Sequence, residues 1–132
     1  FTLALEEEDY NNLENVPCFF LPFYAPATAA TIGKGDIPRN SRVVVFDVNT
    51  IMAKKSDRAV AMILHEVGHV LDSVGGEDGA DDFAVARGYG QSLVDDLKQE
   101  VKDNPLTFDK EETHRRIQRI QDLLKDKEES DV

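Results

Sequence analysis

Residues 56–74, SDRAVAMILHEVGHVLDSV, decide the fold of this chain. Apolar residues in this stretch recur at spacings of three and four, which is typical of a helix with one face on a protein core. The residues of that face are Ala59, Ile63, Val67, Val70 and Val74, and Val60, Leu64 and Leu71 widen it. Ser56 or Asp57 can cap the start of the helix, and Gly75-Gly76 ends it. We therefore expect a helix that is mostly buried.

The polar residues of this helix form the pattern His65-Glu66-x-x-His69. Residues four apart lie on the same face of a helix, so both imidazoles can reach one metal ion. Glu66 lies one step round the helix from His65, at the position for a base that acts on a metal-activated water. Single histidines in buried helices are usually hydrogen-bonded core groups. Here, however, the polar residues share one stripe with Asp72, and burying that stripe without a ligand is expensive. We therefore predict a zinc ion, Zn2+, bound by His65 and His69.

A third ligand is needed, because catalytic zinc sites usually have three protein ligands and a water. Glu77 and Asp81 stand four apart at the start of the next predicted helix, so they face the same way. One of them can bind the metal while the other accepts the N–H of a ligating histidine. Asp72 and His114 are further alternatives.

The turn between the two helices bears on that choice. A glycine at 75 or 76 can take a positive φ and reverse the chain at once, which brings the long side chain of Glu77 back to the ion. Asp81, one turn later and one methylene shorter, then meets a histidine N–H. If the first helix continues through Gly75, Asp72 becomes the better ligand.

Two other metal sites fit the sequence less well. A metzincin needs a glycine three residues after the second histidine and a further histidine three residues later, but this chain has Asp72 and Gly75 there. The acidic cluster around Asp78 and Asp82 lacks the twelve-residue loop of a calcium-binding EF-hand. Carboxylates at a solvated helix start explain both residues, because the helix dipole favours them there.

The motif His65-Glu-Val-Gly-His69, followed by Glu77-x-x-Ala-Asp81, resembles the zinc metallopeptidases of the zincin type, in particular the Glu-zincins. In those enzymes a glutamate from a following Glu-x-x-Ala-Asp helix joins the two histidines. The resemblance implies that His65, His69 and Glu77 are the metal ligands. It also implies that Glu66 is the general base and that Asp81 is the partner of a ligating histidine.

The rest of the chain predicts short strands before the central helix and further helices after it. Residues 42–48, RVVVFDV, are the clearest strand, and their apolar run predicts burial on both sides. Residues 1–5 and 27–32 are weaker strands, 6–15 have a helical composition, and 16–26 form extended chain. A second helix is expected over 77–102 with a kink at Gly88 and Gly90, and a charged helix over about 107–128. We therefore expect an α+β fold, a zincin-like minimal domain in which a small β-sheet packs against the HExxH helix and further helices.

The composition excludes several classes of protein. The chain has 132 residues, enough for one domain over 1–132, and 41% hydrophobic residues supply a core. Lys and Arg total 15 against 26 Asp and Glu, and the net charge of −11 argues against nucleic-acid or membrane-surface binding. The single cysteine, Cys18, can form neither an internal disulfide nor a zinc ribbon. We expect no membrane span and no signal peptide, and a cytoplasmic protein or part of a soluble assembly.

Two functions follow from these observations. The first is a zinc metallopeptidase, a hydrolase that cleaves a peptide or protein substrate with Glu66 as general base. The second is a catalytically silent zincin-like domain with a structural, binding or assembly role in a larger complex. The apolar stripe of Ile117, Ile120 and Leu124 on the last helix packs either on the body of the protein or on a protein partner.

Overall fold

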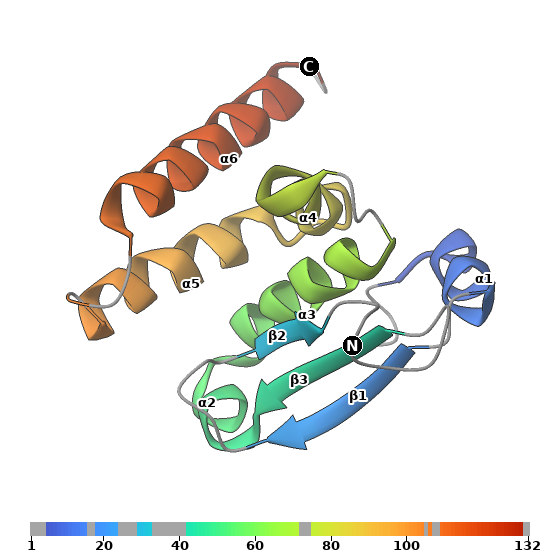
Figure 1. Cartoon of the computed structure of the whole chain (residues 1–132). Coiled ribbons are helices and arrows are strands. Elements are labelled where there is room, and N and C mark those ends of the chain that lie inside the picture. The colour runs from blue at the N-terminus through green and yellow to red at the C-terminus, as the bar shows by residue number, and fades with distance from the viewer. Residues whose placement is uncertain are drawn as a thin grey trace.

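The computed structural model describes residues 5–15, 18–23, 29–32, 42–71, 75–104, 106 and 109–130. The elements within these ranges are, in order, α1 (Glu7–Asn15), β1 (Cys18–Phe23), β2 (Ala29–Ile32), β3 (Arg42–Asp47), α2 (Val48–Ala53), α3 (Ser56–Leu71), α4 (Gly76–Ala86), α5 (Gly90–Asp103) and α6 (Lys110–Ser130). Helix α3 packs against the strands on one side and against α4 and α5 on the other. Helix α6 crosses α4 and α5 on the side away from the strands (Figure 1).

The three strands form a mixed sheet with β3 in the centre. β1 runs parallel to β3, with Cys18 opposite Arg42, and β2 runs antiparallel to it, with Ala29 opposite Phe46. The strand expected over 42–48 is β3, and Val44 within it is buried. The strand expected over 27–32 is β2, whereas residues 1–4 of the strand suggested for 1–5 lie outside the described residues.

The core that the described residues form is made by helices, and this corrects the α+β prediction. The buried members of the hydrophobic core cluster are Ala61, Leu64, Ala84, Val85, Leu93, Val94, Leu97, Ile117 and Ile120. All of them lie on α3, α4, α5 or α6, and none of the strand residues with described side chains belongs to the cluster. The strands are only four to six residues long, whereas the four helices have 11 to 21 residues and bury their apolar faces in one another. The prediction of a zincin-like α+β domain organised on a small sheet is therefore wrong for the described chain, which is predominantly helical.

Two glycines set the path of the chain around α4. Gly76 has φ +60° at the first residue of α4, and Gly88 has φ +87° between α4 and α5. Residues with a Cβ rarely adopt such angles, so both turns depend on glycine. Gly76 starts the second helix close to the predicted position. Gly88 divides the single kinked helix expected over 77–102 into α4 and α5, because a residue at this φ cannot continue a right-handed helix.

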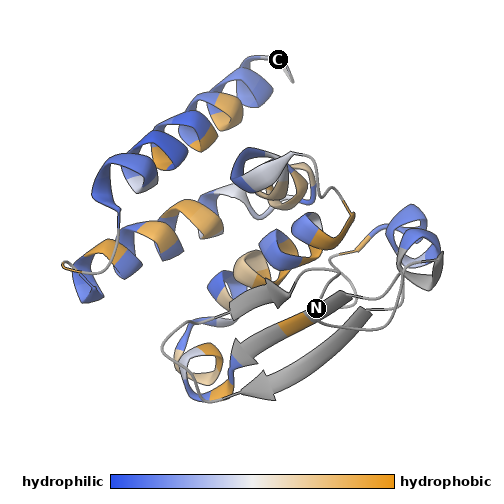
Figure 2. Cartoon of the chain, in the orientation of Figure 1, coloured by the Kyte–Doolittle hydropathy of each residue, from blue (hydrophilic) through white to orange (hydrophobic). Residues whose placement is uncertain are grey.

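The apolar stripe of α6 packs on the body of the protein. Ile117 and Ile120 are buried in the cluster, and Leu124 packs against it. Figure 2 shows hydrophobic positions among hydrophilic ones along α5 and α6, as in helices that bury one face. A protein partner on the remaining surface of α6 stays a prediction.

Candidate metal centre

Helix α3 presents the two histidines of the motif in its buried half. His65 is 7% exposed and Glu66 is 8% exposed, while His69 is partly buried. The histidines project from successive turns, and their rings meet edge to face with centroids 4.6 Å apart. The apolar residues around them hold this polar stripe inside the protein.

Helix α4 approaches α3 closely, because Gly68 lies between the two histidines of the motif. A Cβ on Gly68 would lie 2.8 Å from the Cα of Ala80 and 2.9 Å from the Cβ of Phe83. The chain turns at Gly76, where α4 begins, so Glu77 and Asp81 lie on the first two turns of α4. The helix pair thus brings both carboxylates to the histidines.

Three donor atoms converge between the helices. The Nε2 atoms of His65 and His69 are 3.0 Å apart, and the two Glu77 carboxylate oxygens lie 3.3 Å from the first and 3.2 Å from the second. The edges of a tetrahedron with metal–donor bonds of about 2.0–2.1 Å are about 3.3 Å long. The donor set and its spacing therefore fit a tetrahedral metal ion, and these three residues could hold one.

The exposed fraction of the side chain increases from His65 through His69 to Glu77. The side chain of His65 is 9% exposed, that of His69 is 22% exposed and that of Glu77 is 47% exposed. The group is therefore open to solvent on the Glu77 side. A closed structural zinc site has four protein ligands, whereas three ligands with one open side are typical of catalytic sites.

Asp81 lies behind His65 and is fully buried. Its Oδ1 is 2.8 Å from the Nδ1 of His65, so an N–H at Nδ1 donates to the carboxylate and leaves the Nε2 lone pair directed at the group. Glu77 therefore lies among the converging donor atoms, and Asp81 lies behind a histidine.

Arg116 of α6 completes the centre, and the sequence interpretation did not include it. Its Nε–H donates to Oδ2 of Asp81 at 2.9 Å, and its Nη2–H donates to Oδ1 at 2.7 Å. A third nitrogen, Nη1, lies 3.1 Å from a carboxylate oxygen of Glu77. The only available signal was an arginine-rich stretch in a charged helix, 35 residues after Asp81.

Electrostatic coupling within the centre shifts the pKa values of His65, Glu77 and Asp81. Burial disfavours the imidazolium of His65, but the hydrogen bonds to Asp81 and Glu77 outweigh burial and raise its pKa to about 9. Hydrogen bonds from His65 and His69 lower the pKa of Glu77. Burial opposes ionisation of Asp81, yet hydrogen bonds from Arg116 and His65 lower its pKa below the usual value. Both carboxyl groups are thus held as carboxylates.

Of the two further ligand alternatives, Asp72 and His114, the structure describes only His114. Asp72 lies outside the described residues, and His114 is exposed on α6 and is no member of the three-residue group. Elsewhere in the described chain, Arg87 binds Asp9 of α1, and Tyr89 packs against the hydrophobic cluster. The carboxylates of Asp78 and Asp82 bind arginines of α6, so they are not merely solvated at a helix start.

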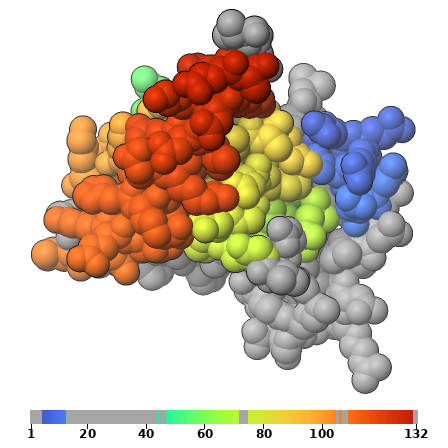
Figure 3. All heavy atoms as spheres, turned by 90° about the horizontal axis from the view of Figure 1, so that it is seen from above, coloured from blue at the N-terminus to red at the C-terminus, as the bar shows by residue number. Residues whose placement is uncertain are grey.

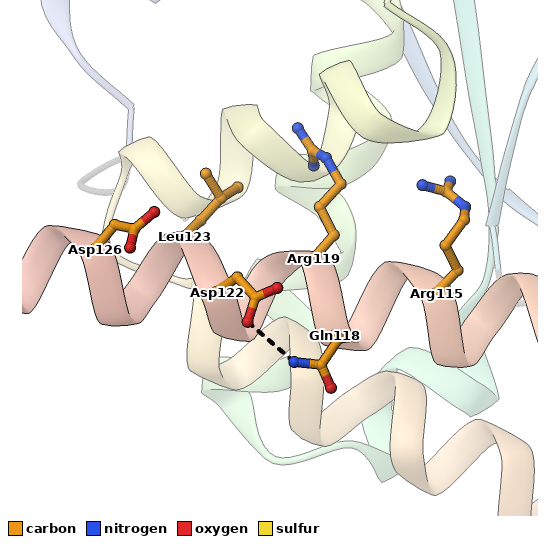
Figure 4. A pocket seen from close by; sticks show the side chains of 6 residues that line it. All are labelled: Arg115, Gln118, Arg119, Asp122, Leu123 and Asp126. Carbon is orange, nitrogen blue, oxygen red and sulfur yellow. Dashed lines mark hydrogen bonds between the residues drawn. The ribbon is translucent and has the colours of Figure 1, made fainter.

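An open depression lies along α6 (Figure 4). Its lining residues are Arg115, Gln118, Arg119, Asp122, Leu123 and Asp126. All six come from one helix, and none belongs to the His-His-Glu group. The depression therefore does not serve the metal centre.

Comparisons with known protein families, curated proteins and solved structures gave no match to this chain. Among the helices that the structure describes, none has both the length and the apolar character needed to cross a membrane. The fold and the site together define a predominantly helical protein with a His-His-Glu group that could hold a metal ion.

Proposed function

We propose that this protein is a zinc-dependent metallopeptidase. The observation that carries the proposal is the convergence of His65, His69 and Glu77 on one point that is open to solvent, with Glu66 next to His65 on α3. Two imidazoles and one carboxylate in a tetrahedral spacing favour zinc over calcium or magnesium, which prefer oxygen ligands in larger number.

His65, His69 and Glu77 would hold the ion through Nε2, Nε2 and a carboxylate oxygen. Zinc in such a site polarises the carbonyl of a scissile peptide bond and lowers the pKa of water. Asp81 accepts the Nδ1–H of His65, which fixes the tautomer and the orientation of that ring.

Glu66 supplies the proton transfer. Its carboxylate accepts a proton from the attacking water while the water oxygen forms a bond to the carbonyl carbon. The same carboxyl group then gives that proton to the amine nitrogen as the C–N bond breaks. Glu66 is 8% exposed, so its carboxyl group is largely shielded from bulk water.

The test combines zinc binding with peptide cleavage. Wild-type protein should bind one zinc per chain in a chelator competition and cleave members of a quenched fluorescent peptide library. Glu66→Gln should keep the zinc and lose at least 100-fold in rate, since general acid–base catalysis typically contributes about 10²–10⁴-fold. Glu77→Gln should lose zinc affinity, whereas Asp95→Asn, a change at an exposed residue of α5, should alter neither.

A wild-type chain that binds no zinc would refute the proposal. A chain that binds zinc but cleaves no peptide, in wild type and Glu66→Gln alike, would instead favour the silent domain with a structural, binding or assembly role.

A further inference from the structure

Three arginines of α6 bind four carboxylates of α4. Seen from above, α6 lies over α4 (Figure 3), and Arg115 and Arg119 project from α6 toward α4 (Figure 4). Arg115 binds Asp78 at 2.8 Å and Arg119 binds Asp82 at 2.8 Å. Arg116 binds Asp81 and Glu77 between these two pairs. The spacing 115, 116 and 119 places all three guanidinium groups on the side of α6 that faces α4.

The three arginines differ in burial. The side chains of Arg115 and Asp78 are 46% and 40% exposed, and those of Arg119 and Asp82 are 30% and 50% exposed. Exposed pairs of this kind contribute little to stability. By contrast, the Arg116 side chain is 11% exposed and that of Asp81 is 0% exposed. The buried pair also differs in its other contacts, because Asp81 and Glu77 both touch a histidine of the group.

We propose that Arg116 is a positioning residue of the metal centre, which sets the affinity for zinc through Asp81 and Glu77. The inference rests on the proposed function. The guanidinium binds Asp81 at both oxygens, and Oδ1 of that carboxylate also meets the Nδ1 of His65. Arg116 therefore fixes the rotation of the Asp81 carboxylate, and that carboxylate in turn orients the imidazole of His65.

Removing Arg116 would leave the charge of Asp81 buried without its cationic partner. A buried carboxylate that has lost its cationic partner is strongly disfavoured, so Asp81 would turn toward solvent. In that orientation it no longer accepts the hydrogen bond that orients His65. Glu77 would lose a cationic neighbour at the same time.

Lysine cannot replace this contact fully. An arginine guanidinium is planar and presents parallel N–H groups that match both oxygens of a carboxylate, whereas a lysine ammonium is a point charge. Arg116→Lys should therefore keep the charge and lose the fixed geometry.

The alternative role for Arg116 is to attach α6 to α4 and nothing more. Arg115 provides the matched control, because it joins the same two helices through a carboxylate, Asp78, that the structure does not place against a histidine. A role in attachment alone predicts that zinc affinity responds to Arg116→Gln no more than to Arg115→Gln.

The experiment measures zinc affinity by chelator competition and the visible absorption of the cobalt-substituted protein. Arg116→Gln should weaken zinc binding about 10–100-fold, the range for residues that orient metal ligands. It should also shift the cobalt d–d bands. Arg115→Gln should stay within about twofold of wild type with unchanged bands, and Arg116→Lys should fall between wild type and Arg116→Gln. In a protein that already carries Asp81→Asn, adding Arg116→Gln should reduce the free energy of zinc binding by less than a third of the reduction it causes in wild type. The reason is that the carboxylate that Arg116 orients has already been replaced.

Equal zinc affinity in Arg116→Gln and Arg115→Gln overturns the inference and leaves the proposed function standing. Additive effects of Arg116→Gln and Asp81→Asn also overturn it. A wild-type chain without zinc affinity overturns the proposed function and this inference together. If Arg116→Gln does not fold, Arg116→Lys decides instead: unchanged affinity and cobalt bands overturn the inference, and a weakened affinity with shifted bands supports it.

Discussion

Replacing Gly68 by alanine tests the close approach of α3 and α4. The new Cβ would lie 2.8 Å from a backbone atom of Ala80 and 2.9 Å from the Cβ of Phe83, so α4 itself must move by several tenths of an ångström. Forced overpacking typically costs about 1–3 kcal/mol. The higher helix propensity of alanine returns about 1 kcal/mol. We therefore expect a net loss of about 1 kcal/mol in unfolding free energy.

The measurement is urea denaturation of the zinc-free protein, followed by a zinc titration. Movement of α4 displaces Glu77, so zinc affinity should fall together with stability. Gly90→Ala is the matched control, since its Cβ would meet the methyl end of Leu124 at 2.9 Å, and a flexible side chain can give way. A Gly68→Ala protein at least as stable as Gly90→Ala, with wild-type zinc affinity, would refute this account of the helix contact.

Three further predictions concern charged groups. The pKa of His65 is raised from 6.5 to about 9 in the folded metal-free protein, so its contribution to stability is complete below pH 6.5 and is lost as pH rises through 9. Urea denaturation with a chelator between pH 6 and 9.5 should show this loss, and His65→Asn should flatten it. Arg87→Met should destabilise the protein by about 3 kcal/mol, because it leaves the buried carboxylate of Asp9 unpaired, and adding Asp9→Asn should restore part of the melting temperature. Lys54→Met should lower the unfolding free energy by a similar amount, because it leaves Asp96 buried without its cation. The double variant with Asp96→Asn should lose less; if it were only as stable as Lys54→Met, the buried charge of Asp96 would not be the cause of the loss.

Local rules were enough to predict the parts of the site that lie close together in sequence. The i, i+4 spacing of His65 and His69 follows from helix geometry, and it holds in α3. The reversal at Gly75-Gly76 also followed from residue type, since φ at Gly76 is +60°. Together these features brought Glu77 and Asp81 to the histidines.

The parts that sequence patterns did not supply depend on contacts between distant segments. Arg116 lies in a helix that the sequence predicted only as charged with one apolar stripe, and nothing local distinguishes it from Arg115 or Arg119. The prediction that the core lies between the sheet and the HExxH helix was wrong for a related reason. Apolar runs in 42–48 indicated a buried strand, but periodicity alone does not say whether a helix buries its stripe on a sheet or on other helices.

The charges at the centre connect these local and distant contributions. Glu77 and Asp81 carry two negative charges against the one positive charge of Arg116, so the group is negative overall when both imidazoles are neutral. The metal-free protein relieves part of this charge by holding a proton on His65, which is why the pKa of His65 is raised despite burial. A divalent cation that replaces this proton relieves the charge more fully, and it does so where two imidazole nitrogens and the carboxylate of Glu77 lie close together. Arg116 is thus suited to balance one of the two carboxylates without cancelling the negative potential that favours a cation.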